Sequence, residues 1–298
     1  MRYDDMIRYN KLLPFLLLSF VITFHSCSEE EETVRLSTFE TASEEIDISY
    51  GSDPLQTYDL YLPANRSVSE TDVIILVHGG SWTGGDKDDI FGIVGLLQTT
   101  MPGYAIANIN YRLTIDPDAL FVDHIADVES VVLDIASRHE ELGVSQDMVM
   151  AGVSAGGHMT LLYAYANNTN DYIKAAGNII GPTFFLDPSY TSGTNPTFLA
   201  TIASITTFTG VPVTDEEYYG RVSPLTFVSS NTIPTIQFLG EVDPLIPVTQ
   251  GTLLQEALNQ AGVANDLIIY EGEGHGWTDL NNWTDTAVRF RDFVEQVL

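Results

Sequence analysis

Hydrophobic and polar positions follow two different patterns along this chain. Between residues 44 and 62 they alternate, which predicts an exposed antiparallel hairpin of two strands, 46–50 and 58–62, around a turn at 51–54. Further along, short runs are solidly apolar, as expected for strands buried on both faces of a parallel sheet. These runs are 73–77, 104–109, 148–151, 175–180, 236–239 and 267–270.

Segments with helical periodicity lie between several of these strands, at 119–139, 158–166, 248–261 and 285–297. Alternating strands and helices predict an α/β fold in which a mostly parallel, doubly wound sheet forms one domain over 44–298. The stretch 182–226 is rich in Thr, Ser, Pro, Gly and aromatic residues and contains no convincing strand. We expect it to be a lid-like insertion over the sheet.

The N-terminus has the pattern of an export signal. Basic residues precede an apolar run at 12–25, which predicts a signal peptide over 1–26. The only cysteine, Cys27, follows directly and resembles the lipid-attachment residue of a bacterial lipobox; Ser26 fits that motif, and Phe24 and His25 depart from it. The alternative is an ordinary cleaved signal with a coincidental cysteine.

An acidic tether is expected over residues 27–43. Its run Glu29–Glu32 resembles the signal that sends some lipoproteins to the outer face of the outer membrane, and the alternative is a solvated linker. We therefore expect an exported protein that is lipid-anchored at the outer membrane and exposed at the cell surface. A periplasmic or secreted protein is the alternative.

The charge of the chain limits its partners. The formal net charge is −29, from 12 basic and 41 acidic side chains. So acidic a surface repels phosphate backbones, which argues against nucleic-acid binding. The scarcity of Lys and Arg also disfavours polyanionic substrates. No membrane contact is expected beyond the lipid anchor.

The segment Gly152-Val153-Ser154-Ala155-Gly156 lies where a buried strand turns into a helix. This is the G-x-S-x-G pattern of a nucleophile elbow, in which a sharp turn exposes the serine hydroxyl and the glycines leave room for close packing. The alternatives are a chance match and an ordinary strand-to-helix turn. Ser154 is therefore a candidate nucleophile.

A serine nucleophile needs a base, and the base needs an orienting acid. His275 lies in a Gly-rich loop after the last strand, from which it can reach across the strand ends; alone it reads as a surface histidine. Asp243 follows the strand 236–239 and falls between Ser154 and His275 in chain order. The alternative for this Asp-Pro pair is turn chemistry, and Glu241 competes for the role of acid.

The segment His78-Gly79-Gly80-Ser81-Trp82 follows the first apolar strand. Consecutive glycines let backbone N–H groups approach a tetrahedral intermediate closely, so this segment is a candidate oxyanion hole. An ordinary Gly-rich turn is the alternative.

Five motifs together resemble the α/β-hydrolase superfamily. They are HGGSWTGGD (78–86), NYR (110–112), GVSAGG (152–157), GEVDPLIP (240–247) and GEGHGW (272–277). The resemblance runs from about residue 45 to 298. Within the superfamily, the chain resembles the carboxylesterase branch that includes acetylxylan and feruloyl esterases and the hormone-sensitive-lipase-like enzymes.

The resemblance implies a role for each matching residue. Ser154 would be the nucleophile, His275 the base and Asp243 the acid. The oxyanion donors would be the N–H groups of Ala155, Gly80 and Ser81, where Ser81 replaces the third glycine of the lipase-like members. The resemblance also implies that Arg112 braces the scaffold with Asp123 or Asp127.

We therefore expect a serine esterase that acts through an acyl-enzyme and needs no metal or cofactor. The expected substrate is a small-molecule or oligosaccharide ester, such as an acetyl or feruloyl ester of a plant polysaccharide. The alternatives are a peptidase or an arylformamidase of the same fold, and a non-catalytic surface binding protein.

Overall fold

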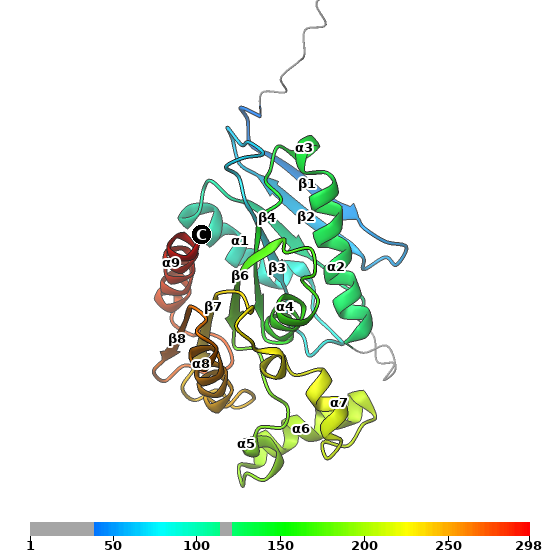
Figure 1. Ribbon diagram of the computed structural model, residues 1–298, viewed down its shortest axis with the longest axis vertical. Helices are drawn as coiled ribbons and strands as arrows, with labels where there is room; N and C mark the ends of the chain where they lie inside the picture. Colours follow the sequence, from blue (N-terminus) through cyan, green and yellow to red (C-terminus); the bar gives the residue numbers. More distant parts are fainter. Residues whose placement is uncertain (1–38, 114–120) are drawn as a thin grey trace, which may run out of the picture. The chain divides into compact units, whose positions relative to one another are not determined.

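A computed structural model describes residues 39–113 and 121–298. The signal peptide, Cys27, the acidic run and the first residues of the helix expected at 119–139 lie outside these ranges. The described part contains an eight-stranded sheet in the order β1-β2-β4-β3-β5-β6-β7-β8 (Figure 1). Its strands are β1 Ser43–Ser49, β2 Thr57–Leu62, β3 Val73–Val77, β4 Ala105–Ile109, β5 Met148–Val153, β6 Ile173–Ile179, β7 Thr235–Gly240 and β8 Asn265–Tyr270.

The first two strands pair antiparallel, as the alternating pattern predicts, and β2 also pairs antiparallel with β4. The remaining neighbours, from β4 to β8, are all parallel. The prediction that this hairpin is exposed is wrong for β2, which is almost entirely buried, whereas β1 is the exposed edge strand. β2 is buried because it lies between β1 and β4 rather than at the edge.

Helices cover both faces of the sheet, so each apolar strand contributes alternate residues to two cores. Val73 and Ile75 of β3 face the core under α2, α4 and α8, while Ile74 and Leu76 face the core under α1 and α9. The helices are α1 Phe91–Thr100, α2 Val122–Ser137, α3 His139–Leu142, α4 Ala155–Ala166, α8 Thr249–Ala261 and α9 Leu280–Val297. The predicted α/β fold with a mostly parallel, doubly wound sheet is confirmed.

The insertion between β6 and β7 is helical. It contains α5 Pro188–Thr191, α6 Pro196–Thr209 and α7 Glu216–Arg221, drawn beyond the end of the sheet in Figure 1. Its base is fixed to α8, because the buried Gln250 side chain accepts hydrogen bonds from the backbone N–H groups of Thr183 and Phe184, both at 2.8 Å.

Several boundaries differ from those predicted. α1 was not expected, α4 begins three residues before 158, and α9 begins at Leu280 behind the N-cap Asp279 rather than at 285. The folded part also begins before residue 44, since the guanidinium of Arg66 lies 4.7 Å from the centre of the Phe39 ring. No helix among the described residues is both long enough and apolar enough to cross a bilayer.

Candidate active site

Ser154 lies at the sharp turn from β5 into α4. Its φ of 54° and ψ of −118° place it in a conformation that L-residues rarely adopt, at a cost of about 1–3 kcal/mol. The turn is held by a hydrogen bond from the Ser154 N–H to the Ile179 carbonyl of β6, at 2.8 Å. The strained backbone lifts the hydroxyl away from the sheet, as the elbow pattern predicts.

The glycines on either side of this turn are required by space. A Cβ at Gly152 would lie 2.3 Å from the carbonyl of Gly156, and a Cβ at Gly156 would lie 2.1 Å from the carbonyl of Val77 in β3. These neighbours are backbone atoms of the sheet and helix, which have no freedom to move aside. The α4 helix therefore packs against β3 as closely as its backbone allows.

The structure brings Ser154, His275 and Asp243 together from three separate loops. The Ser154 hydroxyl lies 2.9 Å from Nε2 of His275, and Nδ1 of His275 lies 2.8 Å from Oδ2 of Asp243. Because the carboxylate only accepts, Nδ1 of His275 carries the proton and Nε2 is left to accept from the serine. Asp243 is buried, and its other oxygen accepts the N–H groups of Leu245 and Ile246 at 2.7 and 2.9 Å.

The competing acid, Glu241, has a different contact. Its side chain accepts a hydrogen bond from the N–H of Gly272 at 3.0 Å and is exposed. A second acid in this region, Glu273, was not singled out from the sequence. Its buried carboxylate accepts from the N–H of Thr278 at 2.7 Å and the N–H of Asp279 at 3.0 Å, and these bonds lower its pKa to about 2. Glu273 thus fixes the loop that carries His275.

The 78–82 segment lies directly over the elbow. A Cβ at Gly79 would be 3.2 Å from Cβ of Ser154. Gly80, Ser81 and Trp82 all have positive φ, of 115°, 53° and 63°. Within residues 39–113 and 121–298, no group accepts a hydrogen bond from the N–H of Gly80, Ser81 or Ala155. These residues therefore offer unused donors beside the serine hydroxyl.

The NYR motif supports this segment. The Tyr111 hydroxyl donates to the carbonyls of His78 and Gly79 at 3.1 and 3.3 Å, and its ring stacks on the His78 imidazole at 4.3 Å. Asn110 accepts from the N–H of Lys87 at 2.7 Å, at the far end of the same loop. The motif thus fixes both ends of the 78–86 loop.

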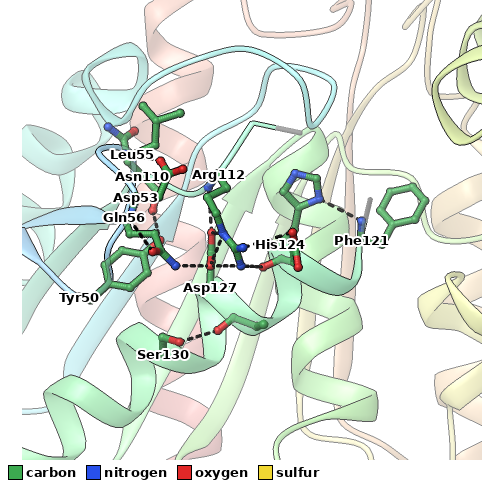
Figure 2. A network of polar contacts seen from close by, with 12 residues as sticks. Tyr50, Asp53, Leu55, Gln56, Asn110, Arg112, Phe121, His124, Asp127 and Ser130 are labelled. Atoms are coloured by element: carbon green, nitrogen blue, oxygen red, sulfur yellow. Dashed lines mark hydrogen bonds and ion pairs between the residues drawn. The ribbon is translucent and has the colours of Figure 1, made fainter. Parts of the chain in front are cut away.

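Arg112 contacts both of its candidate partners. Its guanidinium lies 2.7 Å from Oδ1 of the buried Asp127 and 3.2 Å from Asp123. Figure 2 shows the Asp127 carboxylate between Arg112 and Gln56, whose amide donates to it at 2.8 Å. The hydrogen bonds to Asp127 raise the pKa of Arg112. This network ties the end of β4 to α2, away from the serine.

Two cavities meet at Ser154. The larger, of about 900 Å³, lies between α1 and α9 and is mostly apolar, with Ile93, Leu96 and Trp283 among its lining residues. The smaller, of about 290 Å³, lies under α6 and is lined by Trp82, Ala155 and a row of small side chains. Those on α6 include Thr197, Ala200, Thr201 and Ser204. Both cavities are mostly apolar, and the smaller one also presents the side chains of Thr197, Thr201 and Ser204.

No three His, Cys, Asp or Glu side chains gather in a metal-binding arrangement in the described part of the chain. The groups beside Ser154 are a base, an acid and backbone donors. Such a set can activate a hydroxyl, take and return one proton, and stabilise an oxyanion.

Comparison with known proteins finds a matching family model and similar proteins that are named as esterases. Residues 58–258 match the family model described as BD-FAE. Esterase LipC of Mycobacterium tuberculosis is 26% identical over 250 residues, which cover 78% of this chain and 60% of LipC. The chain thus spans less than two thirds of the length of that relative.

Two solved structures share the fold. A truncated carbohydrate esterase from gut microbiota has a TM-score of 0.71 and 19% identity. The match covers 87% of this chain and 98% of the esterase chain. A bifunctional GH43-CE protein of Bacteroides eggerthii has a TM-score of 0.70 and 23% identity, covering 86% of this chain and 38% of its own. With two thirds of its length matched by the family model, the chain belongs to the BD-FAE family and has the α/β-hydrolase fold.

Proposed function

We propose that this protein hydrolyses carboxylic esters through an acyl-enzyme on Ser154. The observation that carries the proposal is the continuous path from Asp243 to Ser154, with contacts of 2.8 and 2.9 Å through the two nitrogens of His275. A base oriented in this way is what a weakly nucleophilic serine requires.

The reaction follows from these positions. Nε2 of His275 takes the Ser154 proton as Oγ attacks the ester carbonyl, and the negative Asp243 stabilises the imidazolium that forms. The same Nε2–H then protonates the departing alcohol. Water attacks the acyl-enzyme in the same manner and gives its proton to His275, which returns it to Oγ of Ser154 as the bond to the acyl group breaks and the carboxylic acid is released.

The backbone donors stabilise the charged intermediate. The N–H groups of Ala155, Gly80 and Ser81 have no other acceptor among the described residues, and all three residues line a cavity with Ser154. Fixed donors of this kind cost no reorganisation when the oxyanion forms, and each one is worth about 10²–10³ in kcat.

The shape of the site supports an ester with two arms of different size, one in each cavity. An acetyl group occupies a small fraction of 900 Å³, so the apolar cavity at α1 and α9 favours a bulky aromatic arm there. The smaller cavity is also mostly apolar, and the hydroxyl groups of Thr197, Thr201 and Ser204 on α6 are available as hydrogen-bond acceptors for a sugar on the other arm. Two structural neighbours are named as carbohydrate esterases or contain a CE part. We therefore propose acyl esters of plant polysaccharides or their oligosaccharides, feruloyl or acetyl, as the substrate class.

Mutation of the nucleophile tests the activity. Ser154→Ala is expected to abolish hydrolysis of p-nitrophenyl acetate and to leave the circular dichroism spectrum unchanged. Ser192→Ala, in an exposed serine after α5, is the matched control and keeps the wild-type rate. Substantial turnover by Ser154→Ala would contradict the assignment.

Acetate and ferulate release from xylan by the protein lacking residues 1–26 tests the substrate class. Release of either acid supports it. Hydrolysis of p-nitrophenyl acetate without release of either acid from xylan or xylan oligosaccharides would refute the polysaccharide part and leave the esterase activity standing.

We also propose that the exported protein is lipid-anchored through Cys27 at the outer membrane. The support is in the sequence: this sole cysteine directly follows the signal-like apolar run. Cys27→Ser is expected to move the protein from the membrane fraction to the soluble fraction with unchanged esterase turnover. Retention of that variant in the membrane fraction would overturn the anchor.

A further inference from the structure

Trp82, at the end of the strained turn 80–82, is held at two points. Its carbonyl lies 3.0 Å from Nε2 of His124, and its indole N–H donates to Nδ1 of His158 at 3.2 Å. Nδ1 of His124 accepts from the N–H of Phe121 at 3.1 Å (Figure 2), so the proton on His124 is on Nε2 and is donated to Trp82. Two neutral imidazoles therefore fix the backbone and the side chain of one residue.

His158 uses both of its ring nitrogens. Because Nδ1 accepts from Trp82, Nε2 carries the proton and donates to the carbonyl of Val222 at 2.7 Å. The side chain is fully buried among the rings of Trp82, Phe121 and Phe185, with centroids 5.1–5.4 Å away. Burial lowers the pKa of His158 to about 4, so the imidazole stays neutral at neutral pH.

This position joins three parts of the molecule. His158 is on α4, one turn after Ser154, and its own N–H donates to the Ser154 carbonyl at 3.1 Å. Trp82 belongs to the turn that carries the N–H groups of Gly80 and Ser81, and Val222 follows α7 of the insertion. Trp82 lines the cavity beside the serine, whereas His158 does not.

We propose that His158 is a positioning residue that holds the 80–82 turn in the geometry of the oxyanion hole. The inference rests on the proposed esterase function. Non-glycine residues with positive φ relax unless their surroundings hold them, and both Ser81 and Trp82 are of this kind. The bond from Trp82 to His158 ties this turn to the helix that carries the nucleophile, so donors and nucleophile keep one geometry.

Removal of the hydrogen bonds with retention of shape tests this role. His158→Phe keeps a flat ring and loses both bonds. We expect kcat for p-nitrophenyl acetate to fall about 10- to 100-fold, less than the 10²–10³ for deletion of a donor, because the donors are misaimed and not removed. His158→Gln retains one acceptor and one donor and is expected to restore kcat to within about fivefold of wild type.

A positioning role predicts that His158→Phe stabilises the transition state less and binds the substrate as well as the wild type does. A boronic acid that forms a tetrahedral adduct with Ser154 is expected to bind His158→Phe more weakly by about the factor lost in kcat. The ether 4-nitrophenyl ethyl ether has no carbonyl, and its inhibition constant is expected to stay within about twofold, since it cannot use the oxyanion donors. A purely structural role would not separate these two ligands.

A double-mutant cycle with Trp82→Phe tests whether the effect of His158 depends on its hydrogen bond with Trp82. If His158 acts through the indole N–H, the double variant loses about as much kcat as the more damaged single variant. Thr160→Val is the matched control: Thr160 is also fully buried on α4, and its hydroxyl has no partner among the described residues. We expect wild-type kcat from it.

The outcomes separate this inference from the proposed function. A wild-type protein with no esterase turnover would refute the proposed function itself. An active wild type whose His158→Phe variant matches Thr160→Val in kcat and in boronic acid affinity would overturn the positioning role. If His158→Phe does not fold, the affinity of Trp82→Phe for the boronic acid is measured instead. An affinity equal to that of the wild type would overturn the proposal.

Discussion

Substitution of Asp243 by Asn tests the proposed acid at the level of single hydrogen bonds. Oδ1 of Asp243 accepts two backbone N–H groups, from Leu245 and Ile246, while the donor to Oδ2 among the described residues is His275. An asparagine has one acceptor and one donor end. Its carbonyl must occupy the Oδ1 position, because an NH₂ group there would face two donors. The NH₂ group therefore points at Nδ1 of His275.

This orientation reverses the tautomer of the base. Nδ1 of His275 then accepts from the amide, so the proton moves to Nε2, the nitrogen that faces Ser154 at 2.9 Å. The base can no longer take the serine proton. A mis-set tautomer of this kind, described for a serine protease, lowers kcat by about 10⁴, which is about 5 kcal/mol of activation free energy.

Steady-state hydrolysis of p-nitrophenyl acetate at pH 7 measures the loss, and nitrogen-15 NMR of His275 reports the tautomer. The urea midpoint of unfolding is expected to change little, since the two backbone bonds remain. The matched control is Glu241→Gln, whose parent side chain contacts Gly272 instead; its kcat stays within about threefold. A kcat within about tenfold of wild type for Asp243→Asn, or greater damage from Glu241→Gln, would refute the reasoning.

Three further variants test the scaffold around the site. Asp127→Asn leaves the Arg112 guanidinium without its buried, negatively charged partner. It is expected to lower the free energy of unfolding by about 2–4 kcal/mol in urea titrations, a value reduced for the partial exposure of Arg112. Unchanged stability would show that this network does not stabilise the fold. Gly156→Ala is expected to abolish activity and much of the folded yield, because its Cβ would lie 2.1 Å from the Val77 carbonyl; an active, stable variant would contradict the close packing. The pKa of Glu273 is depressed to about 2 from about 4.3 in the unfolded chain, so its contribution to stability is present above about pH 4.3 and is lost as pH falls toward 2. Glu273→Gln is therefore expected to flatten the loss of stability between about pH 4.3 and 2, and equal slopes for both proteins would rule out this role.

The strongest sequence signals came from strands and from motifs with a steric requirement. Buried parallel strands such as β3 are continuous apolar runs, and the elbow at Ser154 needs Gly152 and Gly156 on either side. Tertiary contacts do not override local requirements of this kind. These signals placed each candidate site residue directly after a particular strand. The structure brings Ser154, His275 and Asp243 within hydrogen-bonding distance.

Elements that depend on distant partners were harder to predict. α1 carries Gly92 and Gly95 and has no clear apolar stripe, and it is stabilised by packing against α9 near the other end of the chain. The burial of β2 depends on its pairing with β4, about fifty residues later. Neither of these contacts can be recognised from the local pattern of hydrophobic and polar residues.

The supporting polar residues were missed for the same reason. Glu273 lies two positions before His275, yet its role depends on N–H groups at the start of α9. His158 was visible only as a histidine one turn after the nucleophile, and its partners Trp82 and Val222 are more than sixty residues away on either side. For Arg112, the sequence left Asp123 and Asp127 as alternatives, and the structure shows contacts with both.

Direct capture of the acyl-enzyme tests the central claim most directly. The wild-type protein is mixed with p-nitrophenyl acetate, quenched in acid within the first turnovers, digested and mapped by mass spectrometry. The proposed mechanism predicts one acetyl group, on Ser154, and none on the matching peptide of Ser154→Ala. Turnover with the acetyl group on another residue, or with an equal label in Ser154→Ala, would contradict it.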